Sequence, residues 1–476
     1  MLQQPASVAK PWRTELRATL GVAWPLAVAN LLQMLIYAVD VFFVARLGAF
    51  ELAASSLAIS LLSIIIWALI GLVGMVSALI AAELGRSRYA IAEVRRSTRM
   101  ALWLAVAAGL LAMLLLSQAG HLLRLTGQDP RLSARAMDYM NIVLWASIPM
   151  LVASVLRNFV SALGRPIFAT VITASAIVVN MLGNYTLVFG NWGAPALGLE
   201  GSAIATVFTG GYIMLAYTVA IQWDRRLRRY RIWGRWWRPE WARLVQLVRL
   251  GTPVMFTWIA EASLFGGAAL LMGRIGVTEL AAHTLALQIA ALAFQVPFGI
   301  GQAATIRVGY HFGAQDREAI ARAGGVAIGV AVAFMLGTAS LMVFAPELIL
   351  GLYIATGDPT NAALVTFASR YLLVAAAFQL ADGLQVVLAS ALRGLQDTRI
   401  PMWIAIGSYW LPGFGVSVLL GFCTPLEGTG VWIGFFTGLT CAAVLLFVRW
   451  LQRDRLGLTL TSQQAAAAKS RAVPAC

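Results

Sequence analysis

Three acidic residues lie inside long apolar stretches of the sequence, where an ionisable side chain is costly. Asp40, Glu261 and Asp382 each have no Lys or Arg within one helical turn on either side. A carboxylate surrounded by hydrocarbon is stable only when it is protonated or bound to a cation. Because both states are reversible, we expect these three acids to serve as an ion-coupling device.

Polar side chains recur at helical spacing near these acids. Gln33 and Tyr37 precede Asp40 at spacings that place all three on one helical face. Asn180 and Asn184 are one turn apart in another apolar stretch. Two further polar stripes contain Gln288 and Gln379. Single amides often join membrane helices, but stripes next to carboxylates favour a polar cavity.

The composition excludes most classes of soluble protein. Of the 476 residues 60% are hydrophobic and 12% are charged, and the mean hydropathy is +0.80. A soluble domain has about 25% charged residues. The three Cys residues have no metal-binding spacing, and no phosphate-binding loop, zinc-protease motif or nucleophile elbow is present. We therefore expect a polytopic membrane protein that is not an enzyme and has no cofactor.

Twelve apolar runs are long enough to cross a bilayer as helices, which takes about 20 residues. The runs cover residues 17–45, 51–80, 98–123, 133–160, 167–190, 200–222, 245–273, 280–308, 321–354, 362–392, 400–422 and 427–450. If they alternate in direction, most of the 35 Lys and Arg residues fall on one side. The positive-inside rule then places both termini in the cytoplasm.

The densest basic segment, residues 224–238, mixes Arg with Trp. Such a mixture could bind single-stranded RNA, but its position between two spans favours a linker near anionic lipid. We therefore expect contact with membrane lipid and none with nucleic acid.

The two halves of the sequence repeat at an offset of 228 residues. RLGAFELAAS at 46–55 aligns with RIGVTELAAH at 274–283, and Pro25 aligns with Pro253. Six spans per half give both copies the same orientation, so the fold is expected to be all-α, with two six-helix lobes related by a pseudo-twofold axis along the membrane normal. The predicted parts are lobes at 1–230 and 246–452, a basic cytoplasmic linker at 231–245 and a disordered tail at 453–476.

The sequence resembles the MATE family of multidrug and toxic compound extrusion transporters, and its NorM-like branch in particular. The resemblance covers residues from about 15 to 450 and is carried by RIGVTELAAH at 274–283, PFGIGQAATIRVG at 297–309 and QVVLASALRG at 385–394. It implies an antiporter of the bacterial inner membrane that exchanges Na⁺ or H⁺ for organic, often aromatic, cations. We expect it to act as a monomer.

The resemblance also implies roles for individual residues. In the C-terminal lobe Glu261 and Asp382 would form the cation site, and Phe378 occupies a position where relatives often have an aromatic hydroxyl. In the N-terminal lobe the resemblance pairs Asp40 with residues of the fifth span and, less firmly, with one of the sixth; these are Asn180, Asn184 and Thr206. Because Phe378 and the two amides are weaker cation ligands than the groups found in some relatives, the choice between Na⁺ and H⁺ stays open.

Two other functions are compatible with a two-lobed membrane protein. A flippase for lipid-linked precursors would need basic residues at mid-depth to hold a pyrophosphate, and the spans contain none there. A membrane-embedded enzyme would need a nucleophile, a base and an orienting group together, and no such set is evident. Both remain weaker alternatives to multidrug antiport.

Overall fold

The structure is a computed structural model that describes residues 11–87, 89–125, 127–234, 236–355 and 358–459. Residues 1–10 and residues 460–476, which belong to the predicted tail, lie outside the described residues. The regular secondary structure of the described residues is helical, as the apolar runs predict.

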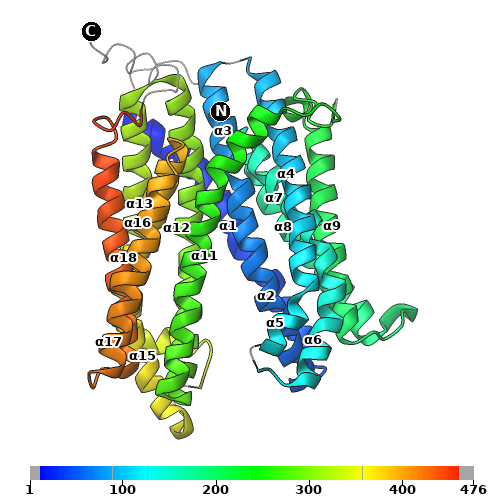
Figure 1. Ribbon diagram of the computed structural model, residues 1–476, viewed down its shortest axis with the longest axis vertical. Helices are drawn as coiled ribbons and strands as arrows, with labels where there is room; N and C mark the ends of the chain where they lie inside the picture. The colour runs from blue at the N-terminus through cyan, green and yellow to red at the C-terminus, as the bar shows by residue number, and fades with distance from the viewer. Residues whose placement is uncertain (1–10, 88, 126, 235, 356–357, 460–476) are drawn as a thin grey trace. The chain divides into compact units, whose positions relative to one another are not determined.

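The described residues of the first half of the chain form ten α-helices and two short 3₁₀ helices (Figure 1). Their bounds are α1 Pro11–Ala45, α2 Ala49–Gly74, α3 Val76–Arg86, α4 Ile91–Ser117, α5 Ala119–Leu125, α6 Pro130–Val143, η1 Leu144–Ala146, α7 Ser147–Ala162, α8 Ile167–Phe189, η2 Asn191–Gly193, α9 Leu199–Trp223 and α10 Arg225–Arg228.

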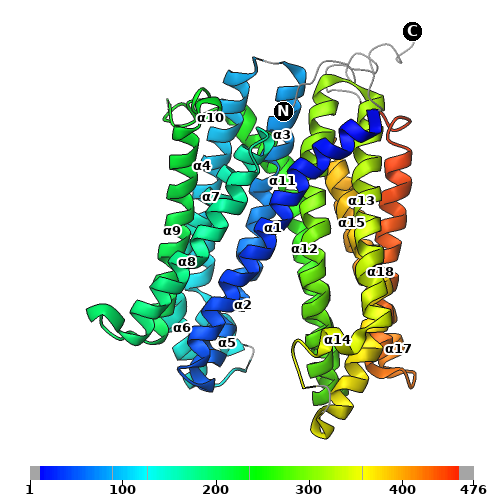
Figure 2. The same ribbon diagram turned by 180° about the vertical axis from the view of Figure 1, so that it is seen from behind.

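In the second half, the part of the chain that the structure describes forms eight α-helices, a 3₁₀ helix and a π-helix (Figure 2). Their bounds are α11 Trp241–Ile275, α12 Val277–Ala314, α13 Arg317–Phe344, α14 Pro346–Leu350, η3 Pro359–Asn361, α15 Ala362–Gly394, α16 Arg399–Ser408, the π-helix η4 Tyr409–Phe414, α17 Gly415–Phe422 and α18 Glu427–Leu451.

The twelve predicted spans are confirmed. Within the described ranges, 12 helical stretches are long and apolar enough to cross a membrane. Several combine two or three consecutive helices, such as Ala49–Arg86, which joins α2 and α3, and Arg399–Phe422, which joins α16, η4 and α17. Each stretch overlaps one predicted apolar run, because length and hydropathy alone decide which segments can span hydrocarbon.

The helices group into two compact units. One contains the residues up to Ala27, the short segment Gly85–Ser87 and the chain from Phe256 onward; we call it the C unit. The other contains Val28–Leu84 and Arg88–Met255; we call it the N unit. The lobe boundaries expected from the sequence remain a prediction.

Local sequence signals set several helix ends. Asp129 caps α6 by accepting hydrogen bonds from the backbone N–H groups of Arg131 and Leu132 at 2.8 and 3.0 Å. Asp316 caps α13 in the same way through the N–H of Ala319. Such caps satisfy backbone donors that a helix leaves unpaired at its start. Gly190 ends α8 with a φ of 75°, a conformation that glycine adopts without strain.

Ion pairs at the two ends of the N unit establish which of its loops lie together. Arg135 bonds Glu51 at 2.9 Å and lies 3.5 Å from Glu200, which joins the loops after the first, third and fifth spans. At the other end Arg99 bonds Glu240 at 2.9 Å, joining the loops after the second and sixth spans. Successive spans therefore alternate in direction.

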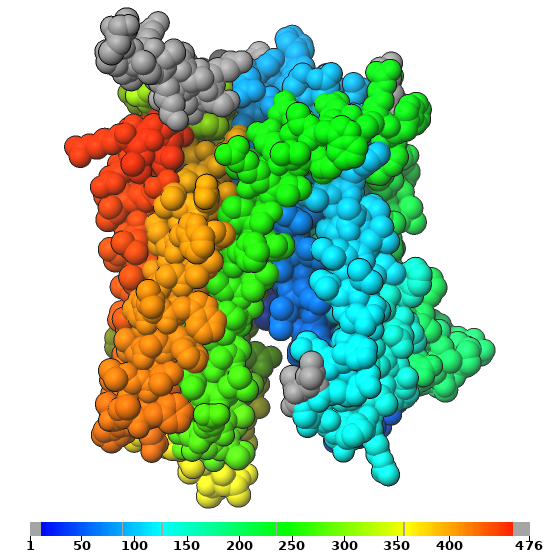
Figure 3. All heavy atoms as spheres, in the orientation of Figure 1, coloured from blue at the N-terminus to red at the C-terminus, as the bar shows by residue number. Residues whose placement is uncertain are grey.

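Aromatic side chains from three helices fill the core of the C unit. Phe378 of α15 meets Trp432 and Phe435 of α18 at ring-centroid distances of 5.6 and 6.0 Å, and Phe265 of α11 meets Phe435 at 5.3 Å. The later part of α11 also touches the ring of Phe414, and Figure 3 shows these parts of the chain side by side on the surface (green and orange). This packing holds α11 and α15, the helices that carry Glu261 and Asp382.

Candidate functional site

Asp40 is the centre of a polar cluster in the N unit. Its side chain is only 3% exposed, and its Oδ1 accepts hydrogen bonds from Nδ2 of Asn180 at 2.9 Å and of Asn184 at 2.8 Å. Thr206 Oγ1 donates to Oδ2 at 3.3 Å. The cluster joins α1, α8 and α9, and it contains the four residues that the resemblance groups together.

Two amide oxygens in this cluster have no hydrogen-bond partner. Oδ1 of Asn180 and Oδ1 of Asn184 are both buried and unpaired within the described residues. Buried polar atoms without partners are uncommon and costly. In this arrangement the amide nitrogens face the carboxylate of Asp40, and rotation of either amide would turn an oxygen, a ligand suited to a hard cation such as Na⁺, toward it.

Two tyrosines lie near this carboxylate. Tyr37 on α1 and Tyr139 on α6 are both close enough to Asp40 for its charge to act on their hydroxyl groups. Gln33, one turn before Tyr37, is half-buried. Sequence reasoning found Gln33 and Tyr37 by their spacing and missed Tyr139, which is buried and comes from a different span.

Glu261 and Asp382 belong to a second polar cluster, in the C unit. They approach from α11 and α15 closely enough for their charges to interact. Asp382 is 5% exposed, and its Oδ1 has no hydrogen-bond partner within the described residues. Gln385 on α15 donates from Nε2 to the hydroxyl oxygen of Tyr409 at 2.6 Å, while its own Oε1 is unpaired. Tyr409 in turn is within range of both acids.

Gln379 adds two further unpaired atoms. It precedes Asp382 by one turn on α15, is 1% exposed, and has neither amide atom hydrogen-bonded within the described residues. A buried amide with four unmade hydrogen bonds is expensive. The unpaired oxygens of Gln379, Asp382 and Gln385 could therefore hold a cation or an ordered water.

A guanidinium lies near Glu261. Arg393 of α15 acts electrostatically on Glu261 and on Tyr409, and its Cζ is 5.9 Å from the ring centroid of Trp258, one turn before Glu261 on α11. Within the described residues no ion pair within 4 Å joins Arg393 to either acid. Sequence reasoning placed Arg393 in a loop and so missed its position beside the cluster.

Phe378 and Gln288 are two further residues that the sequence predicted for a polar cavity. Phe378 is buried in the aromatic core, where its ring meets Trp432 and Phe435, and Gln288 lies on an exposed face of α12. Their predicted contribution to a polar cavity stays a prediction.

Tyr409 is a third residue that sequence reasoning missed, after Tyr139 and Arg393. It opens the π-helix η4, which contains Pro412. A π-helix inside a span often marks a functional position, and proline removes a backbone donor there. A polar aromatic residue three positions before a proline in a span was the available signal.

The sequence matches the MatE family model over residues 25–186 and 253–419. These two blocks cover most of both halves. The chain belongs to the MATE family. MATE proteins are transporters rather than enzymes, and the two matched blocks agree with the internal repeat.

Bacterial relatives match almost the whole MATE chain. A probable multidrug resistance protein NorM of Mesorhizobium japonicum is 41% identical over 445 residues, which cover 94% of this chain and 95% of that relative. One of Brucella suis is 40% identical over 444 residues, covering 93% and 94%.

Solved MATE structures share the fold. The crystal structure of the eukaryotic MATE transporter AtDTX14 superposes with a TM-score of 0.83 at 19% identity, covering 97% of this chain and all of that one. An outward-facing multidrug resistance MATE transporter of the MOP superfamily gives 0.82 at 20% identity, covering 94% and 97%. The expected twelve-span transporter fold is thus confirmed.

Proposed function

We propose that this chain is a cation-coupled multidrug efflux antiporter that expels organic cations by alternating access. The buried carboxylates are the observation that carries the proposal. Asp40, Glu261 and Asp382 lie in membrane spans among side-chain oxygens that lack partners. An arrangement that only stabilised the fold would pair those atoms, since unpaired buried polar groups cost free energy.

Entry of the coupling ion neutralises the carboxylates. In the C unit Na⁺ would be held by Asp382 and Glu261 with amide oxygens of Gln379 or Gln385, whereas H⁺ would reside on one of the two acids. In the N unit Asp40 with Asn180 offers a second position. Neutralisation weakens the attraction between the carboxylates and a bound organic cation, so binding of ion and drug oppose each other reciprocally.

Bacterial relatives and the charge distribution support a place in the inner membrane with both termini in the cytoplasm. Loops that carry Arg96, Arg99, Arg165 and Arg243 share one end of the N unit through ion pairs, and that end is cytoplasmic by the positive-inside rule. The relatives named as multidrug resistance proteins favour drug export over lipid flipping, and nothing in the two clusters resembles a nucleophile with its base.

Ethidium efflux from proteoliposomes tests the proposal. We expect Glu261→Gln and Asp382→Asn to abolish efflux driven by an imposed sodium or pH gradient while the protein still inserts, because each amide keeps the side-chain shape and loses the charge. Glu347→Gln is a matched control, since Glu347 is exposed in the same unit.

Equal ethidium efflux by wild type, Glu261→Gln and Asp382→Asn would refute the assignment of these acids. Ethidium efflux by the wild type that proceeds without movement of either ion would refute antiport itself. A comparison of the two gradients identifies the coupling ion.

A further inference from the structure

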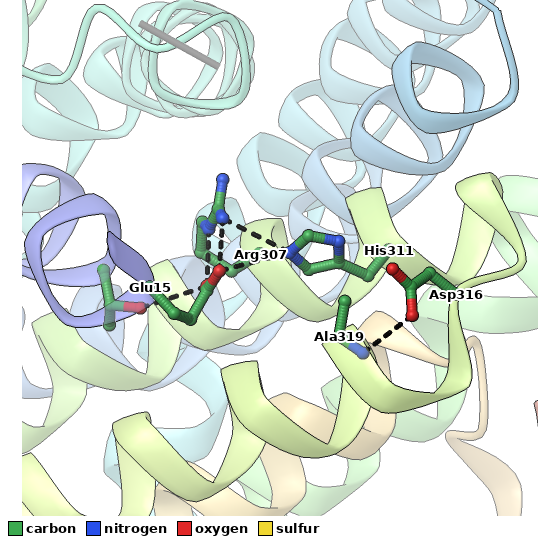
Figure 4. A network of polar contacts seen from close by, with 6 residues as sticks. Glu15, Arg307, His311, Asp316 and Ala319 are labelled. Carbon is green, nitrogen blue, oxygen red and sulfur yellow. Dashed lines mark hydrogen bonds and ion pairs between the residues drawn. The ribbon is translucent and has the colours of Figure 1, made fainter. Parts of the chain in front are cut away.

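A buried charge cluster joins the start of α1 to α12 in the C unit. Glu15 accepts two hydrogen bonds from Arg307, at 2.8 Å from Nε and 2.6 Å from Nη2. His311 Nε2 lies 3.3 Å from Glu15 and 3.2 Å from Arg307 (Figure 4). Thr19 Oγ1 is 3.5 Å from Glu15. Bidentate pairing of a guanidinium with a carboxylate fixes both distance and orientation.

The backbones of α1 and α12 also approach each other closely. A Cβ atom added to Gly299 of α12 would lie 2.7 Å from the backbone N of Ala27. Only glycine leaves room for such an approach. The first part of α1 is therefore held in the C unit at two levels, by charge at Glu15 and by close packing at Ala27.

The start of α11 is held in the N unit in the same two ways. Arg243 Nη1 bonds Oε1 of Glu83 on α3 at 2.9 Å. A Cβ atom on Gly251 of α11 would collide with the carbonyl of Leu72 on α2. Both contacts lie within the N unit.

Part of each cluster occupies equivalent positions in the internal repeat: the contact of Glu15 with His311 corresponds to that of Arg243 with Glu83, whereas the counterpart of Arg307 is Leu79. An offset of 228 residues takes Glu15 to Arg243 and Glu83 to His311. Both halves thus place a polar contact at the same pair of positions, and the acidic residue stands at the first position in one half and at the second position in the other. Because the residue types differ while the pairing persists, the repeat retains the interaction rather than the sequence.

Each of these helices changes unit just after a proline. In α1 the residues up to Ala27 belong to the C unit and those from Val28 to the N unit, two positions after Pro25. In α11 the change comes between Met255 and Phe256, after Pro253. Proline interrupts helical hydrogen bonding, so it is a natural point of bending.

Each helix also carries a proposed coupling acid beyond its proline. Asp40 lies on the N-unit part of α1, and Glu261 lies on the C-unit part of α11. We propose that Glu15–Arg307–His311 and Glu83–Arg243 are paired clamps that anchor the starts of α1 and α11 in opposite units. Each helix is anchored at its start in one unit and carries its acid in the other unit. A movement of the helix near the acid is therefore transmitted to the unit that holds its anchored start.

This inference rests on the proposed function for its transport readout. Glu15, Arg307, Glu83 and Arg243 are positioning residues, because they are argued to act through their ion pairs with one another. Releasing a clamp should uncouple the units while leaving drug binding intact. We expect Glu15→Gln and Arg243→Gln each to slow ion-driven ethidium efflux about tenfold, within the usual range of coupling between sites, with the ethidium Kd changed by less than about twofold.

Hydrogen–deuterium exchange of the full-length protein measures clamp release without drug or ion. In Glu15→Gln, peptides covering residues 11–27 should exchange faster than in the wild type, while those covering 28–45 stay unchanged. In Arg243→Gln the same contrast is expected between residues 241–255 and 256–275. Glu318→Gln and Glu93→Gln are matched controls, since both acids form weaker, more exposed pairs with Arg322 and Arg96.

Swapping the two charged residues of one ion pair separates loss of the clamp from a general loss of protein stability. The double variant Glu83→Arg with Arg243→Glu should restore both slow exchange of residues 241–255 and efflux. If the single variants fail to insert, this double variant decides: a folded, transporting protein supports the clamp, and a protein without transport overturns it.

Wild-type efflux by Glu15→Gln despite faster exchange of residues 11–27 would also overturn the inference. If the wild type moves no ethidium under any gradient, the proposed function fails, and the exchange contrasts still decide whether the clamps hold.

Discussion

Replacing Asp40 with Asn separates the ionic role of this residue from its structural role. Asn180 and Asn184 donate to Oδ1 of Asp40, and Thr206 donates to Oδ2. In Asp40→Asn the remaining carbonyl oxygen can keep both amide bonds. The new amide nitrogen can donate to Thr206 Oγ1, whose hydroxyl already has the carbonyl of Ser202 as an acceptor at 3.0 Å. All three contacts therefore survive without the charge.

The expected change in folding free energy is small. Hydrogen bonds to a charged group contribute roughly 1 kcal/mol more than neutral ones, so the three bonds together lose about 3 kcal/mol. Removing a buried charge returns several kcal/mol of desolvation. Asp40→Asn should therefore insert and fold. An ion at 100 times its Kd stabilises the site that binds it by about 2.7 kcal/mol, and the variant should lose this stabilisation.

Hydrogen–deuterium exchange of α8 and α9 provides the assay. In the wild type, the coupling ion should slow exchange of the most protected amides by about 100-fold, the equivalent of 2.7 kcal/mol. Sodium chloride is compared with choline chloride at two pH values, after correction for intrinsic exchange. Asp358→Asn is the control, because Asp358 is exposed and lies between spans. An ion effect of equal size in Asp40→Asn and wild type would refute the role of Asp40.

Two further predictions concern the cluster of the C unit. Arg393→Gln removes a positive charge near Glu261, so the coupling ion should bind more tightly. We expect the ion concentration for half-maximal efflux to fall about tenfold, which corresponds to about 1.4 kcal/mol. An unchanged ion concentration for half-maximal efflux would contradict this prediction. Tyr409→Phe removes the hydroxyl oxygen that accepts the hydrogen bond from the Gln385 amide at 2.6 Å. The free energy of unfolding should fall by about 1–3 kcal/mol, which urea titration of the purified protein measures. An unaltered urea midpoint would show that this hydrogen bond contributes nothing to stability.

The spans and the acids inside them could be predicted because both follow from local sequence. Hydropathy over 20 residues decides which segments enter hydrocarbon, and the helical period places Gln33, Tyr37 and Asp40 on one face. The meeting of Asp40 with Asn180 and Asn184 came from the family resemblance, since period alone cannot say which helices face each other.

The surroundings of Glu261 could not be predicted in the same way. Arg393 follows Asp382 by eleven positions on its own helix, so the sequence assigned it to a loop, yet packing of α11 against α15 brings it near Glu261. The membership of residues up to Ala27 in the C unit was also hidden. It depends on contacts of Glu15 with residues almost 300 positions later.

Counter-movement of the ion tests the central claim, that buried carboxylates exchange a small cation for an organic one. Proteoliposomes are loaded with ethidium, no ion gradient is imposed, and uptake of ²²Na⁺ and H⁺ is followed as ethidium leaves. The wild type should take up one of these ions in proportion to ethidium released, and Glu261→Gln with Asp382→Asn should take up neither. Ethidium release by the wild type without uptake of either ion would contradict the account.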